Sequence, residues 1–356
     1  MYIVVLAVLL LGALVEPGFC YVAFMKKRDI TEIFFLVTCI ALMLIAAFRV
    51  NIGRDYDTYT SSLVYLHKGS SLSWLNYEPG FMLLCKLLAP FTKNGHIIII
   101  VTSIITMGLV YVSIKKYSVN AFQSLFLYYS LYLFCNSLNL VRQFIAIGII
   151  LVSLNAIMNQ QLFKSMLCIG IAAMFHSSAL LCIPFFFFQK IKMSKRVIIS
   201  ISLVAAFIAF FYEYIIRIVA ILLPKYARYL EGAGSSSYFN ILILALSLIM
   251  LLYIKEYSLY GVADDKMLNF FISATVFCMI ITAFTVKIVY FARASFYFFA
   301  ISIFSIPYCW NQTKGRIEQY VFKAVIIVAA IILFLHLLNA NTGTIAPYQL
   351  WDFRAL

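Results

Sequence analysis

The sequence predicts an all-α integral membrane protein that crosses the bilayer about ten times and also carries re-entrant or short helices. Of its 356 residues, 65% are hydrophobic and 11% are charged, whereas soluble proteins carry about 25% charged residues. The apolar runs are continuous over about 18–25 residues, the length of a membrane-spanning helix, and they lack the alternation of transmembrane β-strands. Because no polar stretch is long enough for a soluble domain, residues 1–356 are predicted to form one transmembrane domain.

Several classes of protein are excluded by composition and missing motifs. The eight cysteines are scattered singly and form no CxxC pair, so they are interpreted as small apolar side chains. There is no Walker loop and no HExxH motif, which argues against an ATP-driven pump and a zinc protease. The net charge of +14 is attributed to cytoplasmic anchoring, and without a basic soluble face no nucleic-acid partner is expected.

The first spans follow from the apolar runs and the basic clusters between them. Residues 2–24 lack the basic start and cleavage site of a signal peptide, so we expect a transmembrane helix. The basic cluster at 26–28 marks the cytoplasmic side, and residues 30–48 return to the outer face. The loop 49–77 is then outside. Segment 78–92 is too short to cross and is expected to be re-entrant or interfacial.

Segment 164–188 has two possible arrangements. A single span would place the basic cluster at 190–196 outside, against the positive-inside rule, so a hairpin of two short helices with His176 at its tip is preferred. The other expected spans are 97–114, 119–136, 139–157, 197–222, 239–254, 267–286, 288–310 and 320–339. The expected outer-face segments are 49–77, 137–141, 223–238 and the tail 340–356.

Arginine is concentrated at the outer face of this topology. Positive-inside signals would place it inside, and its planar, permanently charged guanidinium is suited to binding phosphate groups. This distribution suggests an anionic ligand on the outer side. The outer arginines are Arg49, Arg54, Arg142, Arg217, Arg228, Arg293 and Arg354.

Arg142 and His176 are the strongest candidates for chemistry. Arg142 lies near the outer end of an apolar span, where ionisable residues are costly and often functional. The alternatives are snorkelling to the interface or a structural pair with Asp55 or Glu78. His176 lies within an apolar hairpin and could take a proton from a sugar hydroxyl as a neutral imidazole. The alternative is a satisfied core histidine.

Other candidates lie on the outer side. Asp55 and Glu78 could act as a base or bind sugar hydroxyls, although they could also pair with arginines in a solvated loop. The rings of Tyr56 and Tyr59 could stack on sugars, although tyrosine also populates the membrane interface. Arg293, in a late helix, and Arg228, in the loop 223–238, are further candidates for anion binding.

Five motifs, taken together, resemble a known family. They occur in the order R-x-x-x-G-R-D-Y-x-x-Y (49–59), Y-E-P-G-F (77–81), N-L-V-R-Q-F-I-A (139–146), F-H-S-S-A-L (175–180) and Y-F-A-R-A (290–294). This ordered set is similar to the EpsG-like group of Wzy-type polysaccharide polymerases, over roughly residues 30–300. One departure is Arg54, because the first motif of the family often reads G-T-D-Y.

The resemblance implies an enzyme that polymerises oligosaccharide repeat units linked to undecaprenyl pyrophosphate, for O-antigen, capsule or exopolysaccharide. The implied place is the outer face of a bacterial inner membrane, and the implied architecture is similar to that of GT-C-like glycosyltransferases. Its partners would be the lipid-linked donor and acceptor, the bilayer and, as a further candidate, a chain-length regulator. The resemblance also implies that the enzyme needs no metal and no other cofactor. In this interpretation His176, Arg142, Asp55 and Glu78 are catalytic. The substrate-binding residues would be Arg49, Arg54, Arg293, Tyr56, Tyr59 and Arg228.

Two alternative functions are kept. One is an O-antigen ligase-like glycosyltransferase, which would typically carry a larger periplasmic loop than this chain has. The other is a flippase or transporter of the same glycan, which should carry ionisable groups reachable from both faces. The clustering of the candidates at one face favours an enzyme.

Overall fold

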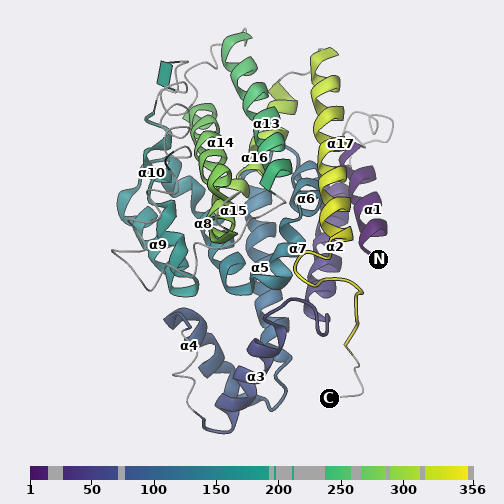
Figure 1. The fold of residues 1–356 in the computed structure, drawn as a ribbon, viewed down its shortest axis with the longest axis vertical. Coiled ribbons are helices and arrows are strands. Elements are labelled where there is room, and N and C mark those ends of the chain that lie inside the picture. Colours follow the sequence, from purple (N-terminus) through teal and green to yellow (C-terminus); the bar gives the residue numbers. More distant parts are fainter. Residues whose placement is uncertain are drawn as a thin grey trace. The chain divides into compact units, whose positions relative to one another are not determined.

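A computed structural model of the chain describes residues 1–14, 27–70, 77–191, 196–197, 211, 237–257, 266–285, 289–312 and 317–351. Over these residues the protein is helical and contains no β-sheet (Figure 1). The chain divides into two compact units. The first comprises Met1–Leu154, Met166–Leu180 and Phe334–Leu356, and the second comprises Asn155–Ser165 and Leu181–Leu333.

Five of the described helices are long and apolar enough to cross a membrane. They are α5 (Ile97–Tyr117), α8 (Val141–Met158), α13 (Ser237–Tyr257), α14 (Lys266–Thr285) and α17 (Ile317–Asn339). This confirms the prediction of a helical membrane protein. Apart from residues 197, 211, 237 and 238, the expected span 197–222 and the loop 223–238, with Arg217 and Arg228, lie outside the described residues.

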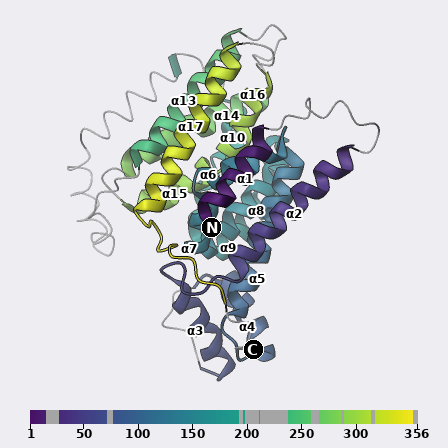
Figure 2. The same cartoon turned by 90° about the vertical axis from the view of Figure 1, so that its right-hand side faces the viewer.

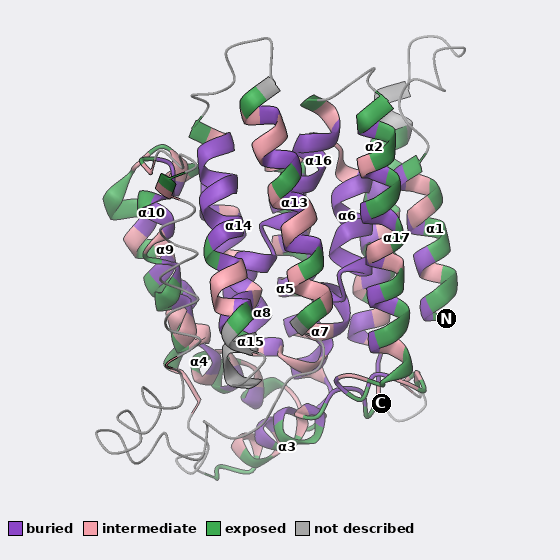
Figure 3. Ribbon diagram, turned by 45° about the horizontal axis from the view of Figure 1, so that its top comes forward, coloured by how far each residue is buried: buried purple, intermediate pink, exposed green. Residues whose placement is uncertain are grey.

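The first unit is built around α5. The helix α2 (Lys27–Ala47) packs along α5, and α1 (Tyr2–Leu14) packs along α6 (Ala121–Ser130) (Figure 2). Most of α6 is buried, whereas α2 exposes apolar side chains such as Ile33 and Val37 (Figure 3). Exposed apolar faces of this kind are typical of helices that contact lipid.

The second unit is held together by aromatic packing. Its helices α13 and α14 lie against each other, and α14 also contacts α15 (Val289–Phe299) and the short α10 (Phe185–Phe188). The ring of Phe185 meets the rings of Phe270 and Phe298 in edge-to-face geometry, at centroid distances of 5.6 and 4.9 Å. Such contacts stabilise aromatic cores beyond simple burial.

Two expected spans are each broken into two helices. Residues 119–136 form α6 and α7 (Leu133–Asn139), because Tyr132 adopts a left-handed φ of 64°. The hydroxyl of Tyr132 donates to the carbonyls of Leu337 and Thr342, so contacts distant in sequence hold this break. Residues 288–310 form α15 and α16 (Ser302–Gln312). Pro307 has no N–H to donate to the carbonyl one helical turn earlier. Just before that turn the backbone hydrogen bonds are irregular, because the N–H groups of Ile301, Ile303 and Phe304 donate to the third residue back and not the fourth.

The segment 164–188 turns back on itself as expected. The helix α9 (Leu162–Phe175) ends immediately before His176. The side chain of Gln189 then donates to the carbonyl of Ile157, at the end of α8, across 2.9 Å. The segment therefore returns to the level from which α9 starts. Its second arm differs from the expected helix, because it is a 3-10 helix (Ser177–Cys182) followed by Pro184 and α10.

Two short helices pack at one end of α5. They are α3 (Tyr56–His67) and α4 (Pro79–Leu88), followed by a 3-10 turn (Ala89–Phe91). These two elements cover most of the segment 78–92, which we expect to be re-entrant or interfacial. Apolar side chains shared by α3, α4, α5 and α8 form one buried cluster, which includes Leu63, Phe81, Ile98 and Ile145. This cluster fixes the position of the residues that precede α4.

Gly53 shapes the turn that leads into α3. Its φ is +94°, and a Cβ atom there would lie 2.6 Å from the carbonyl oxygen of Leu138. Gly69 also has a positive φ, of +77°, but has open space around it. Replacing Gly53 with alanine is therefore expected to lower the free energy of unfolding by more than the roughly 1–2 kcal/mol of a left-handed alanine alone.

Thermal unfolding of the detergent-solubilised protein measures this effect, with Gly69→Ala as the matched control. We expect Gly53→Ala to reduce the melting temperature more than Gly69→Ala, because only Gly53 combines the strained φ with a backbone clash. Equal melting temperatures for the two variants would contradict this account of the turn.

Candidate functional site

The start of α4 positions Glu78. Pro79 occupies the first helical turn, where its fixed φ suits the helix and its missing N–H is not needed. The backbone of Gly80 comes so close to α9 that a Cβ atom would lie 2.8 Å from the carbonyl oxygen of Met174. The end of α9 therefore lies directly against the start of α4, and this contact brings His176 to Glu78.

Glu78 lies between a histidine and an arginine. Its Oε1 atom accepts hydrogen bonds from Nδ1 of His176, at 3.0 Å, and from the backbone N–H of Ser177, at 3.2 Å. Its Oε2 atom pairs with Nη1 of Arg142, in the first turn of α8. The three side chains are 15–21% exposed, so the cluster is largely shielded from solvent but still accessible to a ligand. We call Glu78, Arg142 and His176 the ionic cluster.

Aromatic residues hold Arg142 in place. The guanidinium lies over the ring of Tyr77, 4.8 Å from its centroid, and near the ring of Phe81. Its Nε atom donates to the hydroxyl of Tyr59 at 3.4 Å. The rings of Tyr59, Tyr77 and Phe81 pack against one another at centroid distances of 5.1–6.1 Å. Within the described part of the chain, the Nη2 group of Arg142 makes no hydrogen bond, so it is available to a ligand.

The hydrogen bonds determine which nitrogen of His176 can act as an acceptor. An ionised carboxylate only accepts, so the proton of the neutral imidazole lies on Nδ1, facing Glu78. The Nε2 atom then carries a lone pair, which makes no hydrogen bond within the described residues and can accept a proton. Burial alone raises the pKa of Glu78, but the hydrogen bond from His176 and the charge of Arg142 outweigh it and hold the pKa at about 2.

The low pKa of Glu78 predicts acid sensitivity. Its pKa is lowered on folding from 4.5 to about 2, so the stabilisation is complete above pH 4.5 and is lost as the pH falls through that interval. We expect a loss on the order of 2 kcal/mol between pH 4.5 and pH 2. The check is thermal unfolding across this range for the wild type and Glu78→Gln, which has no carboxylate to protonate there. Parallel curves for the two proteins would contradict the assignment.

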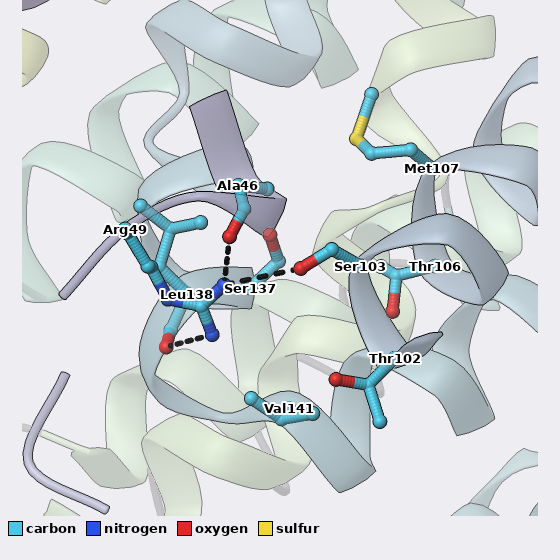
Figure 4. A pocket seen from close by; sticks show the side chains of 9 residues that line it. All are labelled: Ala46, Arg49, Thr102, Ser103, Thr106, Met107, Ser137, Leu138 and Val141. Atoms are coloured by element: carbon cyan, nitrogen blue, oxygen red, sulfur yellow. Dashed lines mark hydrogen bonds between the residues drawn. The ribbon is translucent and has the colours of Figure 1, made fainter. Parts of the chain in front are cut away.

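The sequence predicts that Arg49 binds the substrate, but Arg49 is buried away from the ionic cluster. It is 2% exposed and its guanidinium donates to the carbonyls of Ala46 and Leu138 and to the hydroxyl of Ser103 (Figure 4). The adjoining cavity measures about 10 Å³, room for about one water molecule. Burial lowers the pKa of Arg49 to about 10. Its contacts tie the end of α2 to α5 and α7, so its observed role is structural.

The rest of the first motif is divided between two sides of α3. Tyr59 reaches the ionic cluster, whereas the hydroxyl of Tyr56 lies 2.8 Å from Nδ1 of His96. Arg54 is exposed, and its backbone N–H donates to the side chain of Asn139. Asp55 is half-buried before α3 and makes no hydrogen bond through its side chain to cap that helix.

Some residues near the ionic cluster and α3 were not among the sequence candidates. Two of the sequence candidates, Arg293 and Arg228, are not placed beside the cluster. The backbone N–H of Ser177 and the ring of Phe81 join the ionic cluster, and the quoted motifs contain both residues. His96, whose position at the start of a long apolar helix gave no signal, binds Tyr56. Arg293 is exposed on α15 in the second unit, and Arg228 lies outside the described residues.

The helices and the ionic cluster define the class of the protein. It is a helical membrane protein with a shielded carboxylate–histidine–arginine cluster beside the short helices α3 and α4.

The chain belongs to the EpsG family, a family of Wzy-like polymerases, since the EpsG family profile matches residues 32–350. This match confirms the resemblance inferred from the five motifs. Neither the search of curated proteins nor the search of solved structures returned a significant match.

Proposed function

We propose that this protein polymerises oligosaccharide repeat units carried on undecaprenyl pyrophosphate, for O-antigen, capsule or exopolysaccharide. The observation that supports this most strongly is the ionic cluster. It combines a histidine and an arginine whose Nε2 and Nη2 atoms make no hydrogen bond to the described residues, so Nε2 can accept and Nη2 can donate. Glycosyl transfer from a lipid pyrophosphate needs both groups, because a hydroxyl loses a proton while a diphosphate departs.

The proposed reaction is a displacement at the anomeric carbon of the donor. The Nε2 atom of His176 accepts the proton of the acceptor hydroxyl, while Glu78 holds the imidazole through Nδ1. The hydroxyl oxygen forms a bond to the anomeric carbon, and the bond from that carbon to the pyrophosphate oxygen breaks. The electron pair of the broken bond leaves with the pyrophosphate. Arg142 donates to this group and stabilises the charge that develops on it.

Arg142 can donate a hydrogen bond to the pyrophosphate while it stays paired with Glu78. Its Nη1 and Nε atoms are engaged by Glu78 and Tyr59, which fix the plane of the guanidinium. The Nη2 group then has a defined direction before the substrate binds, as electrostatic stabilisation of a transition state requires. Asp55, Arg54, Arg293 and Arg228 remain predicted contributors to the same reaction.

The proposed setting is a bacterial inner membrane, with α3, α4 and the ionic cluster at its outer face. The proposal retains about ten spans and a GT-C-like architecture, since the described helices supply only part of the expected set. Cysteine labelling tests the orientation, using Ser70→Cys for the outer side and Lys190→Cys for the inner side. We expect an impermeant reagent added outside to label only Ser70→Cys. Labelling of Lys190→Cys from outside would contradict the topology.

A deletion strain distinguishes the proposed function from its alternatives. Loss of the chain should leave single repeat units on the mature lipid or carrier and remove the ladder of longer glycans. Accumulation of lipid-linked repeat units on the inner leaflet would instead indicate a flippase. Long glycans that remain on undecaprenyl pyrophosphate, without transfer to their final lipid, would indicate a ligase.

A further inference from the structure

A second cavity lies on the other side of α3. Its volume is about 430 Å³, within the roughly 300–1,000 Å³ that is usual for small-molecule sites. Residues 56, 60, 64 and 68 are spaced by one helical turn and line it, whereas Tyr59 and Leu63 face the ionic cluster and its apolar support. Thus α3 carries the reaction site on one side and this cavity on the other. We call this cavity the outer groove.

The rest of the lining comes from Val50, which follows α2, and from two further segments. The first is the turn before α5, which contributes Asn94, Gly95 and His96. The backbone of Gly95 packs tightly against the carbonyl of Thr60, and a Cβ atom there would clash with it. The second is Trp351 of the C-terminal tail, whose ring stacks on His96 at a centroid distance of 4.6 Å. The backbone N–H of Trp351 donates to the carbonyl of Phe48 at 2.8 Å, which holds the tail in place.

The chemistry of the groove suits a carbohydrate. Tyr56, Tyr65 and Trp351 supply aromatic surface for the C–H faces of pyranose rings. Ser61 and Asn94 supply polar groups, and the Nδ2 amino group of Asn94 makes no hydrogen bond to the described residues. Lys68 is the only charged residue that lines the groove in the described part of the chain, which is too little for a pyrophosphate. A neutral or weakly acidic glycan matches this lining.

We propose that the outer groove binds the growing glycan, several sugars away from the bond being made. This inference rests on the proposed function. The groove is separated from the ionic cluster by the thickness of α3, about 10 Å for a helix with its side chains. A polymer whose reacting end lies at the cluster can therefore continue over α3 into the groove. Binding there keeps the product engaged between additions, and so sets its final length.

Two variants test the groove without touching the ionic cluster. Tyr65→Ala removes an exposed ring, and Ser61→Trp fills the cavity from an exposed helix position. Tyr238→Ala is the matched control, because it removes an exposed tyrosine from α13. The ligand probe is a lipid-free oligosaccharide, released by mild acid from lipid-linked glycan of the host and titrated into the full-length protein in nanodiscs. Glycan length is read from the product ladder in the complemented deletion strain.

We expect both groove variants to weaken oligosaccharide binding by about tenfold or more and to shift the product towards short chains, with linkages still formed. Tyr238→Ala should match the wild type in both measurements. The inference is overturned if both groove variants bind and polymerise like the wild type. It is also overturned if they lose every linkage, as a variant of the ionic cluster would. Oligosaccharide binding by a wild type that forms no linkage would support the groove and refute the proposed function.

Discussion

Replacing Arg142 with alanine is expected to reduce the rate of linkage formation by about 10²–10³-fold, the usual effect of removing one preorganised donor from a developing anion. The variant loses the Nη2 group, which makes no hydrogen bond to the described residues and is proposed to bind the pyrophosphate. Arg142→Lys should recover only a small part of the activity, because an ammonium keeps the charge but not the planar fork. The measurement is the rate at which reconstituted protein extends lipid-linked repeat units.

The control for charge is Lys86→Ala, which removes an exposed cation from α4, the helix that follows Glu78. We expect this variant to retain wild-type activity. If Arg142→Lys were as active as the wild type, bidentate or directional binding by Arg142 would be disproved. If Arg142→Ala were as active, the arginine would have no part in the reaction.

Replacing His176 with glutamine is expected to slow the reaction by about 10²–10⁴-fold, the range typical of a lost general base. Glutamine can still reach Glu78 through its amide, so the packing around α4 and α9 is largely preserved. What the variant loses is the Nε2 lone pair that accepts the proton. The same rate assay measures the effect, and the affinity for lipid-linked substrate should change far less than the rate.

His67→Gln is the matched control for this histidine. His67 is also half-buried, but its Nδ1 atom lies 2.8 Å from the backbone carbonyl of Ala89. It has no carboxylate partner in the described structure, and we expect its replacement to leave the rate unchanged. A His176→Gln variant with the rate of the wild type would rule out His176 as the base.

The sequence indicated Arg142 and His176 because placing an ionisable side chain in an apolar segment costs free energy. An arginine in the first turn of an apolar span and a histidine between two apolar arms are expensive unless they are paired or used. Glu78 was a candidate because it is an acid on the outer side of the expected topology, where it could act as a base or bind sugar hydroxyls. What the sequence could not show was that one carboxylate joins both, since this depends on the close approach of Gly80 to α9.

At two positions the local structure differs from the prediction, because contacts distant in sequence decide it. Arg49 stands in the most polar run of the chain, yet backbone carbonyls of Ala46 and Leu138 replace water around it. Tyr132 breaks a continuous apolar run without a glycine or proline, because its hydroxyl is bound by carbonyls about 200 residues later. No local pattern encodes either contact.

The outer groove could not be predicted from the sequence for the same reason. Its residues come from α3, from the turn before α5, from Val50 after α2 and from the C-terminal tail, which pairs with the end of α2. Each segment taken alone has an ordinary interfacial composition of tyrosine, tryptophan and small polar residues. The pairing of the tail with the end of α2, through Trp351 with Phe48 and Gln349 with Val50, brings them around one cavity.

The central claim is that the ionic cluster carries out glycosyl transfer and does not merely hold α4, α8 and α9 together. The most direct test is the double variant Arg142→Met with Glu78→Gln, measured for melting temperature and polymerisation together. Removing both partners of a shielded ion pair is often close to neutral for stability, whereas removing one is not. We predict that the double variant melts close to the wild type, above the single Arg142→Met variant, and makes no polymer. Restored polymerisation alongside restored stability would show that the pair is structural, and would contradict the account.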